Sequence, residues 1–117
     1  MWTEMTKRQQ NALLAEHIMK WSRVGSKNRN FDTFMDDSGE VRIINEPAAM
    51  NCFMPTDNLH DAWKLVDKCE LENFVLSKTI NRKWRCHIMP GKYAEAGSPT
   101  EAICLAVLER INKNLLE

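Results

Sequence analysis

Cationic side chains interleaved with aromatic ones are the residues of this sequence best suited to binding chemistry. Between Asn73 and Ala94 the chain has no acid, and the five cations there are Lys78, Arg82, Lys83, Arg85 and Lys92. A second acid-free segment, residues 17–31, holds the cations Lys20, Arg23, Lys27 and Arg29. The guanidinium fork of arginine matches phosphate oxygens, and aromatic rings stack on bases. Both segments are therefore typical of a site for a nucleotide or another small anionic ligand.

We expect the two segments to line one pocket, with the turn at 81–85 and the loop at 23–29 on its two sides. An aromatic ring would stack on a base, and arginines would hold the phosphates. The predicted ligand-binding residues are Arg23, Lys27, Arg29, Asn81, Arg82, Trp84, Arg85, His87, Lys92 and Tyr93. A structural interpretation stays open, because basic hairpins also occur on surfaces that bind nothing, and acidic and basic segments can pair with each other. Trp21 and Trp84 also fit core positions by their periodicity.

The total charge of the chain limits the partners that it can have. Its 117 residues contain 16 Lys and Arg against 16 Asp and Glu, so the formal net charge is zero. Neutrality argues against bulk nucleic-acid binding of the histone type and against an acidic mimic of DNA. The total conceals an uneven distribution, since residues 36–72 hold nine acids and three cations. A small anionic ligand at one local site therefore stays compatible with the sequence.

The sequence contains no catalytic motif. It has no G-x-S-x-G elbow, no P-loop and no G-x-G-x-x-G fingerprint. His60, which precedes Asp61, is expected to have a surface or capping role in a helix. Asp36, Asp37 and Glu40 offer oxygens that suit a hard cation, but D-D-S-G is a strong turn signal, and we favour the turn. We therefore expect no enzymatic activity, no cofactor and no metal site.

The cysteines are predicted to be buried free thiols in a reducing compartment. Cys52, Cys69, Cys86 and Cys104 are separated by 17, 17 and 18 residues and lie beside apolar neighbours. A zinc site would need closely spaced pairs, and a disulfide framework would need a secreted chain. The first residues lack the pattern of a signal peptide, and no apolar run approaches about 18 residues. We expect a protein of the cytoplasm with no membrane partner.

Three segments have the periodicity of helices, and each has a start signal. The predicted spans are 6–22, 56–70 and 98–115. The start signals, in the same order, are a capping box of Thr6 with Gln9, a cap of Thr56 or Asp57, and an N-cap Ser98 followed by Pro99. The last of these is the strongest local signal in the chain.

The remaining segments are β-prone and separated by turn signals. The predicted hairpins pair 31–35 with 41–44 and 73–79 with 84–89, and a short extended piece lies around 93–95. Residues 45–56 have no clear period, yet Met50, Phe53 and Met54 must pack somewhere. The order is α-β-β-α-β-β-(β)-α in a single domain, 1–117. We expect an α+β fold in which the strands form one antiparallel sheet and three helices pack on it.

Several blocks of residues together resemble one family. They are L-A-E-H-I-M-K-W at 14–21, F-M-P-T-D at 53–57 followed by A-W at 62–63, W-R-C at 84–86, Y-A-E-A at 93–96 and P-T-E-A-I-C-L-A at 99–106. In order and spacing the chain is similar to the phage ABA sandwich domain family. The resemblance implies a phage origin and an α/β/α sandwich, and it carries no catalytic residues. Residues 25–51 depart from the family pattern, so expectations for that segment depend on its residues alone.

These observations favour a non-enzymatic binding protein. We expect a phage protein in the host cytoplasm that sequesters a small phosphate-bearing nucleotide signal of host antiviral immunity. A homo-oligomer, a dimer or larger, is expected, because a small domain often completes a pocket across an interface. The alternative is a protein-binding module, such as an inhibitor of a host protein or an assembly accessory, that uses the acidic segment 36–72 and the seven methionines.

Overall fold

A computed structural model of the chain describes residues 2–25, 31–44, 46, 49–88, 93–112 and 116. Within these residues the α-helices are α1 (Lys7–His17), α2 (Leu59–Lys68) and α3 (Pro99–Ile111), and a 3₁₀ turn, Trp2–Glu4, precedes α1. The strands are β1 (Ser22–Arg23), β2 (Asp32–Met35), β3 (Val41–Ile44), β4 (Phe74–Lys78), β5 (Trp84–Ile88) and β6 (Tyr93–Ala96). Among the described residues no helix is long and apolar enough to cross a membrane.

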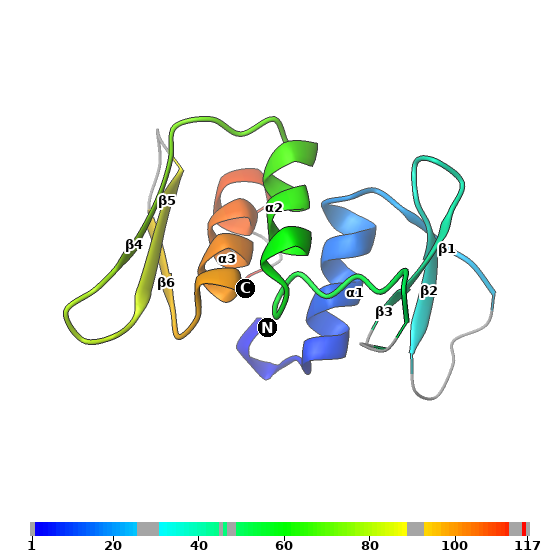
Figure 1. Cartoon of the computed structure of the whole chain (residues 1–117), viewed down its shortest axis with the longest axis horizontal. Helices are drawn as coiled ribbons and strands as arrows, with labels where there is room; N and C mark the ends of the chain where they lie inside the picture. Colours follow the sequence, from blue (N-terminus) through cyan, green and yellow to red (C-terminus); the bar gives the residue numbers. More distant parts are fainter. Residues whose placement is uncertain are drawn as a thin grey trace.

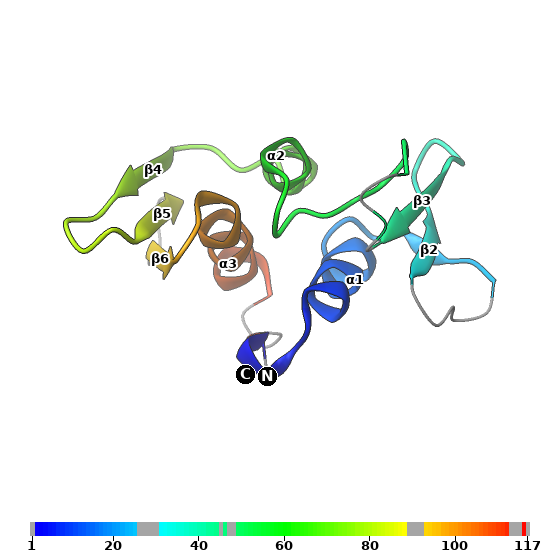
Figure 2. The ribbon, with the colours of Figure 1, turned by 60° about the horizontal axis from the view of Figure 1, so that its bottom comes forward.

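The helices lie between two sheets at the ends of the molecule. Figure 1 shows β1, β2 and β3 at one end of the long axis and β4, β5 and β6 at the other. In the turned view of Figure 2 the helices still lie between the sheets. In the described chain each sheet has three antiparallel strands, in the orders β1-β2-β3 and β4-β5-β6. We refer to them as the N-terminal sheet and the C-terminal sheet.

The predicted α+β class and element order are confirmed, but the expectation of a single sheet with helices on both sides, an α/β/α sandwich, is wrong, because the helices lie between two sheets (Figure 1). The N-terminal sheet packs on α1, whereas β5 and β6 pack on α3. Each hairpin thus buries its apolar face against a different helix, and α2 with the preceding connection separates the two hairpins in the chain. The segment predicted as a loop after the first helix also contributes β1, whose Arg23 pairs with Phe34 of β2.

The predicted helix starts are confirmed for α1 and α3 and wrong for α2. Thr6 and Gln9 form the capping box, and Ser98 caps α3 with Pro99 in its first turn. The cap of α2 is Asn58, whose side-chain oxygen accepts from the Asp61 amide at 2.9 Å. Thr56 lies two residues before this cap, is buried, and bonds through its backbone to two other elements.

Those bonds form a buried polar link in the middle of the fold. The Thr56 amide donates to the Asn11 side chain of α1 at 3.0 Å, and the Thr100 hydroxyl of α3 donates to the Thr56 carbonyl at 2.6 Å. Asn11, Thr56 and Thr100 are all buried. Because unpaired buried backbone groups are costly, these bonds fix the path of the chain into α2.

The first helix ends earlier than predicted, at His17 rather than residue 22. Lys20 has a φ of 62°, in the left-handed region, and this turns the chain away from the helix axis. The turn brings the buried Trp21 ring to 4.6 Å from that of Phe53, between ring centroids. Tertiary packing of Trp21 therefore accounts for the early helix end.

Candidate functional site

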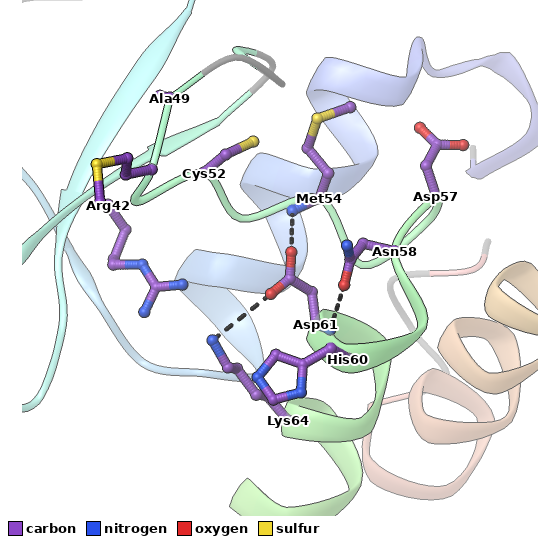
Figure 3. Close-up of a pocket in the computed structure, with 10 residues that line it drawn as sticks. Arg42, Ala49, Cys52, Met54, Asp57, Asn58, His60, Asp61 and Lys64 are labelled. Atoms are coloured by element: carbon purple, nitrogen blue, oxygen red, sulfur yellow. Dashed lines mark hydrogen bonds and ion pairs between the residues drawn. The ribbon is translucent and has the colours of Figure 1, made fainter.

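A cavity of about 560 Å³ lies between β3, the connection before α2, and the first turns of α2. Figure 3 shows the side chains that line it. They are Arg42 from β3, then Ala49, Met50, Cys52, Met54 and Asp57 from the connection, and Asn58, His60, Asp61 and Lys64 from the start of α2. This volume falls within the range of ordinary small-molecule sites, which is about 300–1,000 Å³.

Cationic side chains from two different elements line the cavity. Arg42 comes from β3 and Lys64 from α2, and in Figure 3 both charged groups point into the space between these elements. Arg42 faces Asp36 at 3.7 Å, and Lys64 faces Asp61 at 3.5 Å, between nitrogen and oxygen atoms. Charge-assisted hydrogen bonds usually measure about 2.7–2.9 Å. Both pairs are therefore loose. Arg42 also donates from Nε to the Asn51 carbonyl at 3.2 Å, so its terminal guanidinium N–H groups and the Lys64 ammonium are the donors that retain capacity for another anion.

Hydrogen bonds of Asp61 and Asn58 fix the cavity wall beside Lys64. The Asp61 carboxylate accepts from the Met54 amide at 2.9 Å, which ties the connection to α2. The Asn58 cap places the N-terminal end of α2 against the cavity. A helix N-terminus carries partial positive charge, and the Asp57 and Asp61 carboxylates that line the cavity offset part of it.

The cavity also holds a thiol and an imidazole side chain, those of Cys52 and His60. Burial raises the pKa of the Cys52 thiol, so it stays protonated and is a poor nucleophile. In Figure 3 the Cys52 sulfur and the His60 ring point to different parts of the wall. Among the described residues, no group of three or more His, Cys, Asp or Glu side chains is arranged to hold a metal ion.

The acidic turn between β2 and β3 is confirmed as a turn. One Asp36 oxygen accepts from the Ser38 amide at 2.9 Å, the Ser38 hydroxyl at 2.6 Å and the Glu40 amide at 2.9 Å. The hydrogen bond from the Ser38 hydroxyl is the main reason why the pKa of Asp36 is lowered. These donors within the turn satisfy the Asp36 oxygen, so the turn needs no bound cation to form.

The basic segment after α1 lies in the N-terminal sheet. The Arg23 guanidinium donates to Asp32 at 2.7 Å and lies 4.8 Å from the centre of the Phe34 ring. Lys27 and Arg29 fall outside the described residues. Arg23 therefore already has an anionic partner within the chain.

The second basic segment lies in the C-terminal sheet, at the opposite end of the molecule (Figure 1). Asn81 and Arg82 are in the exposed β4–β5 turn, where Asn81 is hydrogen-bonded by the Thr79 hydroxyl. Trp84 packs against the core. Arg85, His87 and Tyr93 lie together on the opposite side of the sheet. Lys92 is outside the described residues. The described members of the two basic segments therefore do not line one pocket within a single chain, and their role as ligand residues stays a prediction.

Sequence reasoning missed Arg42 and Lys64 because they lie in the acidic segment 36–72. Their charges are outnumbered there, and 22 positions separate them in the chain. A local signal did exist, because Arg42 and Lys64 are two of only three cations in that segment. Nothing in the spacing indicated that β3 and α2 would face each other.

The cysteines should differ in reactivity according to their burial. Burial raises the pKa of Cys86 to about 12, and it raises the pKa of Cys104 further. We expect iodoacetamide at neutral pH to leave both unmodified in the native protein, and to modify the half-buried Cys52 and Cys69 slowly. Peptide mapping by mass spectrometry, with urea-unfolded protein as the fully modified control, measures this. Rapid native labelling of Cys104 would contradict the burial seen in the fold.

Comparisons with known proteins agree with this architecture. The chain is similar to a phage protein from Bacillus cereus with a crystal structure at 2.0 Å, with a TM-score of 0.60, 22% identity, and coverage of 92% of this chain and 93% of that chain. At this identity the likeness concerns the fold alone. A comparison with curated proteins gives no significant match. The family model described as the phage ABA sandwich domain matches residues 12–108, which is most of the sequence. The chain therefore belongs to the phage ABA sandwich domain family.

Proposed function

We propose that this phage protein is a non-enzymatic binding protein that sequesters a small phosphate-bearing nucleotide signal of host immunity in the host cytoplasm. The observation that carries the proposal is the cavity in which Arg42 and Lys64 approach from separate walls. Its family is not a known family of enzymes. The ligand would therefore bind within the acidic segment 36–72, which supplies the lining of the cavity, and not at the two basic segments.

The geometry of the cavity supports a phosphate-bearing ligand. Phosphate oxygens would replace or share the loose partners of Arg42 and Lys64, which lie at 3.7 and 3.5 Å. Met50 and Met54 line the same cavity and offer flexible apolar surface for a base. The ligand would thus have its charged end near β3 and α2 and its apolar part near the connection.

Substitution of the cavity cations should weaken binding while the fold persists. Hydrogen bonds to charged groups contribute about 1.5–3 kcal/mol, so Arg42→Gln and Lys64→Gln should each reduce affinity about 10- to 100-fold. Calorimetry with cyclic nucleotides and cyclic ADP-ribose isomers, combined with the melting temperature, measures this. The matched control is Lys68→Gln on the same helix, because Lys68 pairs with Asp37 and does not line the cavity.

Two results would contradict the proposal. One is the absence of heat from every nucleotide together with an unchanged melting temperature. The other is a nucleotide affinity that is the same in Arg42→Gln, Lys64→Gln and the control Lys68→Gln.

A second candidate, a protein-binding module, is favoured by the exposed face of α2. Leu59 and Trp63 are one helical turn apart and both exposed, and the Trp63 ring lies edge-on to Phe74 at 5.0 Å. Exposed acids, Asp67 and Glu70, follow on the same stretch. Native mass spectrometry of protein purified from infected cells separates the candidates, because it detects a retained nucleotide or a stoichiometric protein.

A further inference from the structure

The C-terminal sheet and its β4–β5 turn carry concentrated positive charge. Its described residues, 74–88 and 93–96, contain four cations and one acid. The cations are Lys78, Arg82, Lys83 and Arg85, of which Lys78 pairs with Trp84 and lies on the side of the sheet that faces the core. The acid, Glu95, is paired with Arg85 at 3.4 Å. The charge at this end of the molecule is therefore positive although the whole chain is neutral.

One side of this sheet has an accessible aromatic ring, that of Tyr93. Strand register places Val75, Ser77, Arg85, His87, Tyr93 and Glu95 on one side of the sheet. Tyr93 is 51% exposed, and the Arg85 guanidinium lies 4.0 Å from the centre of its ring. In Figures 1 and 2, α3 covers the other side of the sheet, and no described helix or strand covers this one.

The Tyr93 ring and the charged turn are close enough to act together. Lys83 precedes β5, and His87, which pairs with Tyr93, is four residues further along. At about 3.3 Å per residue the two positions are about 13 Å apart, so one strand can reach both. Arg82 and Lys83 are both exposed in the turn.

We propose that this face binds single-stranded nucleic acid. Phosphates would lie along the cations of the β4–β5 turn, and an unstacked base would pack on the Tyr93 and Arg85 pair. A duplex does not expose a base face for such stacking, so single strands are preferred. Because the net charge of the chain is zero, binding should be weak and strongly salt-dependent. This site is separate from the cavity and does not depend on the function proposed for it.

Fluorescence anisotropy with short labelled oligouridylate, oligothymidylate and a duplex tests the proposal at low and high salt. We expect both single strands to bind the full chain at low salt and the duplex to bind less. Tyr93→Ala and Lys83→Glu should each weaken binding about tenfold. The control Lys20→Glu makes the same charge change at an exposed position between α1 and the N-terminal sheet, and it should leave affinity unchanged.

Three outcomes would overturn the inference. The first is no anisotropy change with either single strand at low salt. The second is a loss of affinity in Lys20→Glu as large as that in Lys83→Glu. The third is tighter binding of the duplex than of the single strands. A fall in oligomer mass on Tyr93→Ala, without an effect on nucleic acid, would assign the face to contacts between copies of the chain instead. Circular dichroism of each variant shows that a loss of binding is not a loss of fold.

Discussion

Replacing Phe53 with alanine should lower the free energy of unfolding by about 4 kcal/mol. The Phe53 side chain is fully buried and packs against the Trp21 ring. Its amide donates to the Ile43 carbonyl at 2.9 Å, so the backbone beside β3 holds the ring in place. A cavity left by the ring can therefore not close by a simple shift of the connection.

Equilibrium urea unfolding measures this loss. Met50→Ala is the matched control, because Met50 belongs to the same connection and is fully exposed. That variant should change stability by no more than about 0.5 kcal/mol. A loss below about 1 kcal/mol for Phe53→Ala would mean that the connection is not part of the core.

Asp32→Ala should cost about 3 kcal/mol, the second largest effect. Asp32 is only 5% exposed, and its carboxylate accepts from Arg8 at 2.8 Å and from Arg23 at 2.7 Å. The variant leaves both guanidinium groups facing each other without their shared anion. It also removes the ionic contacts that join α1 and β1 to β2.

The pH dependence gives a second test of Asp32. The hydrogen bond from Arg8, and then that from Arg23, hold the pKa of Asp32 below its ordinary value of 3.8. A lowered pKa contributes stability that is present above the ordinary value and is lost as pH falls through the folded value. The stability difference between the native chain and Asp32→Ala should therefore be constant near neutral pH and narrow below about pH 4.

Asp37→Ala is the control for this prediction. Asp37 also forms a short ion pair, with Lys68 at 2.7 Å, but its side chain is 65% exposed. Exposed pairs contribute about 0–1 kcal/mol, so this variant should be nearly neutral. Equal losses from Asp32→Ala and Asp37→Ala would show that burial does not set the strength of the Asp32 cluster.

The sequence by itself determined the features that neighbouring residues encode. The box of Thr6 and Gln9 and the pair Ser98 and Pro99 start their helices where predicted, because each cap needs only three or four consecutive residues. The hairpins formed around the predicted turns for the same reason. These local signals were sufficient for the α+β class, the element order and the resemblance to the family.

Only the tertiary structure decided how these elements are arranged. An apolar strand face specifies burial but not the helix that covers it, so the strands form separate sheets on α1 and α3 instead of one sheet. Likewise, the backbone of Thr56 bonds to α1 and α3, α2 begins only after Asn58, and packing of Trp21 on Phe53 shortened α1. The site follows the same rule, because Arg42 and Lys64 meet only when β3 and α2 pack around the connection. Charge and residue type are properties of a sequence, whereas a shared cavity is created by contacts between residues that are distant in the chain.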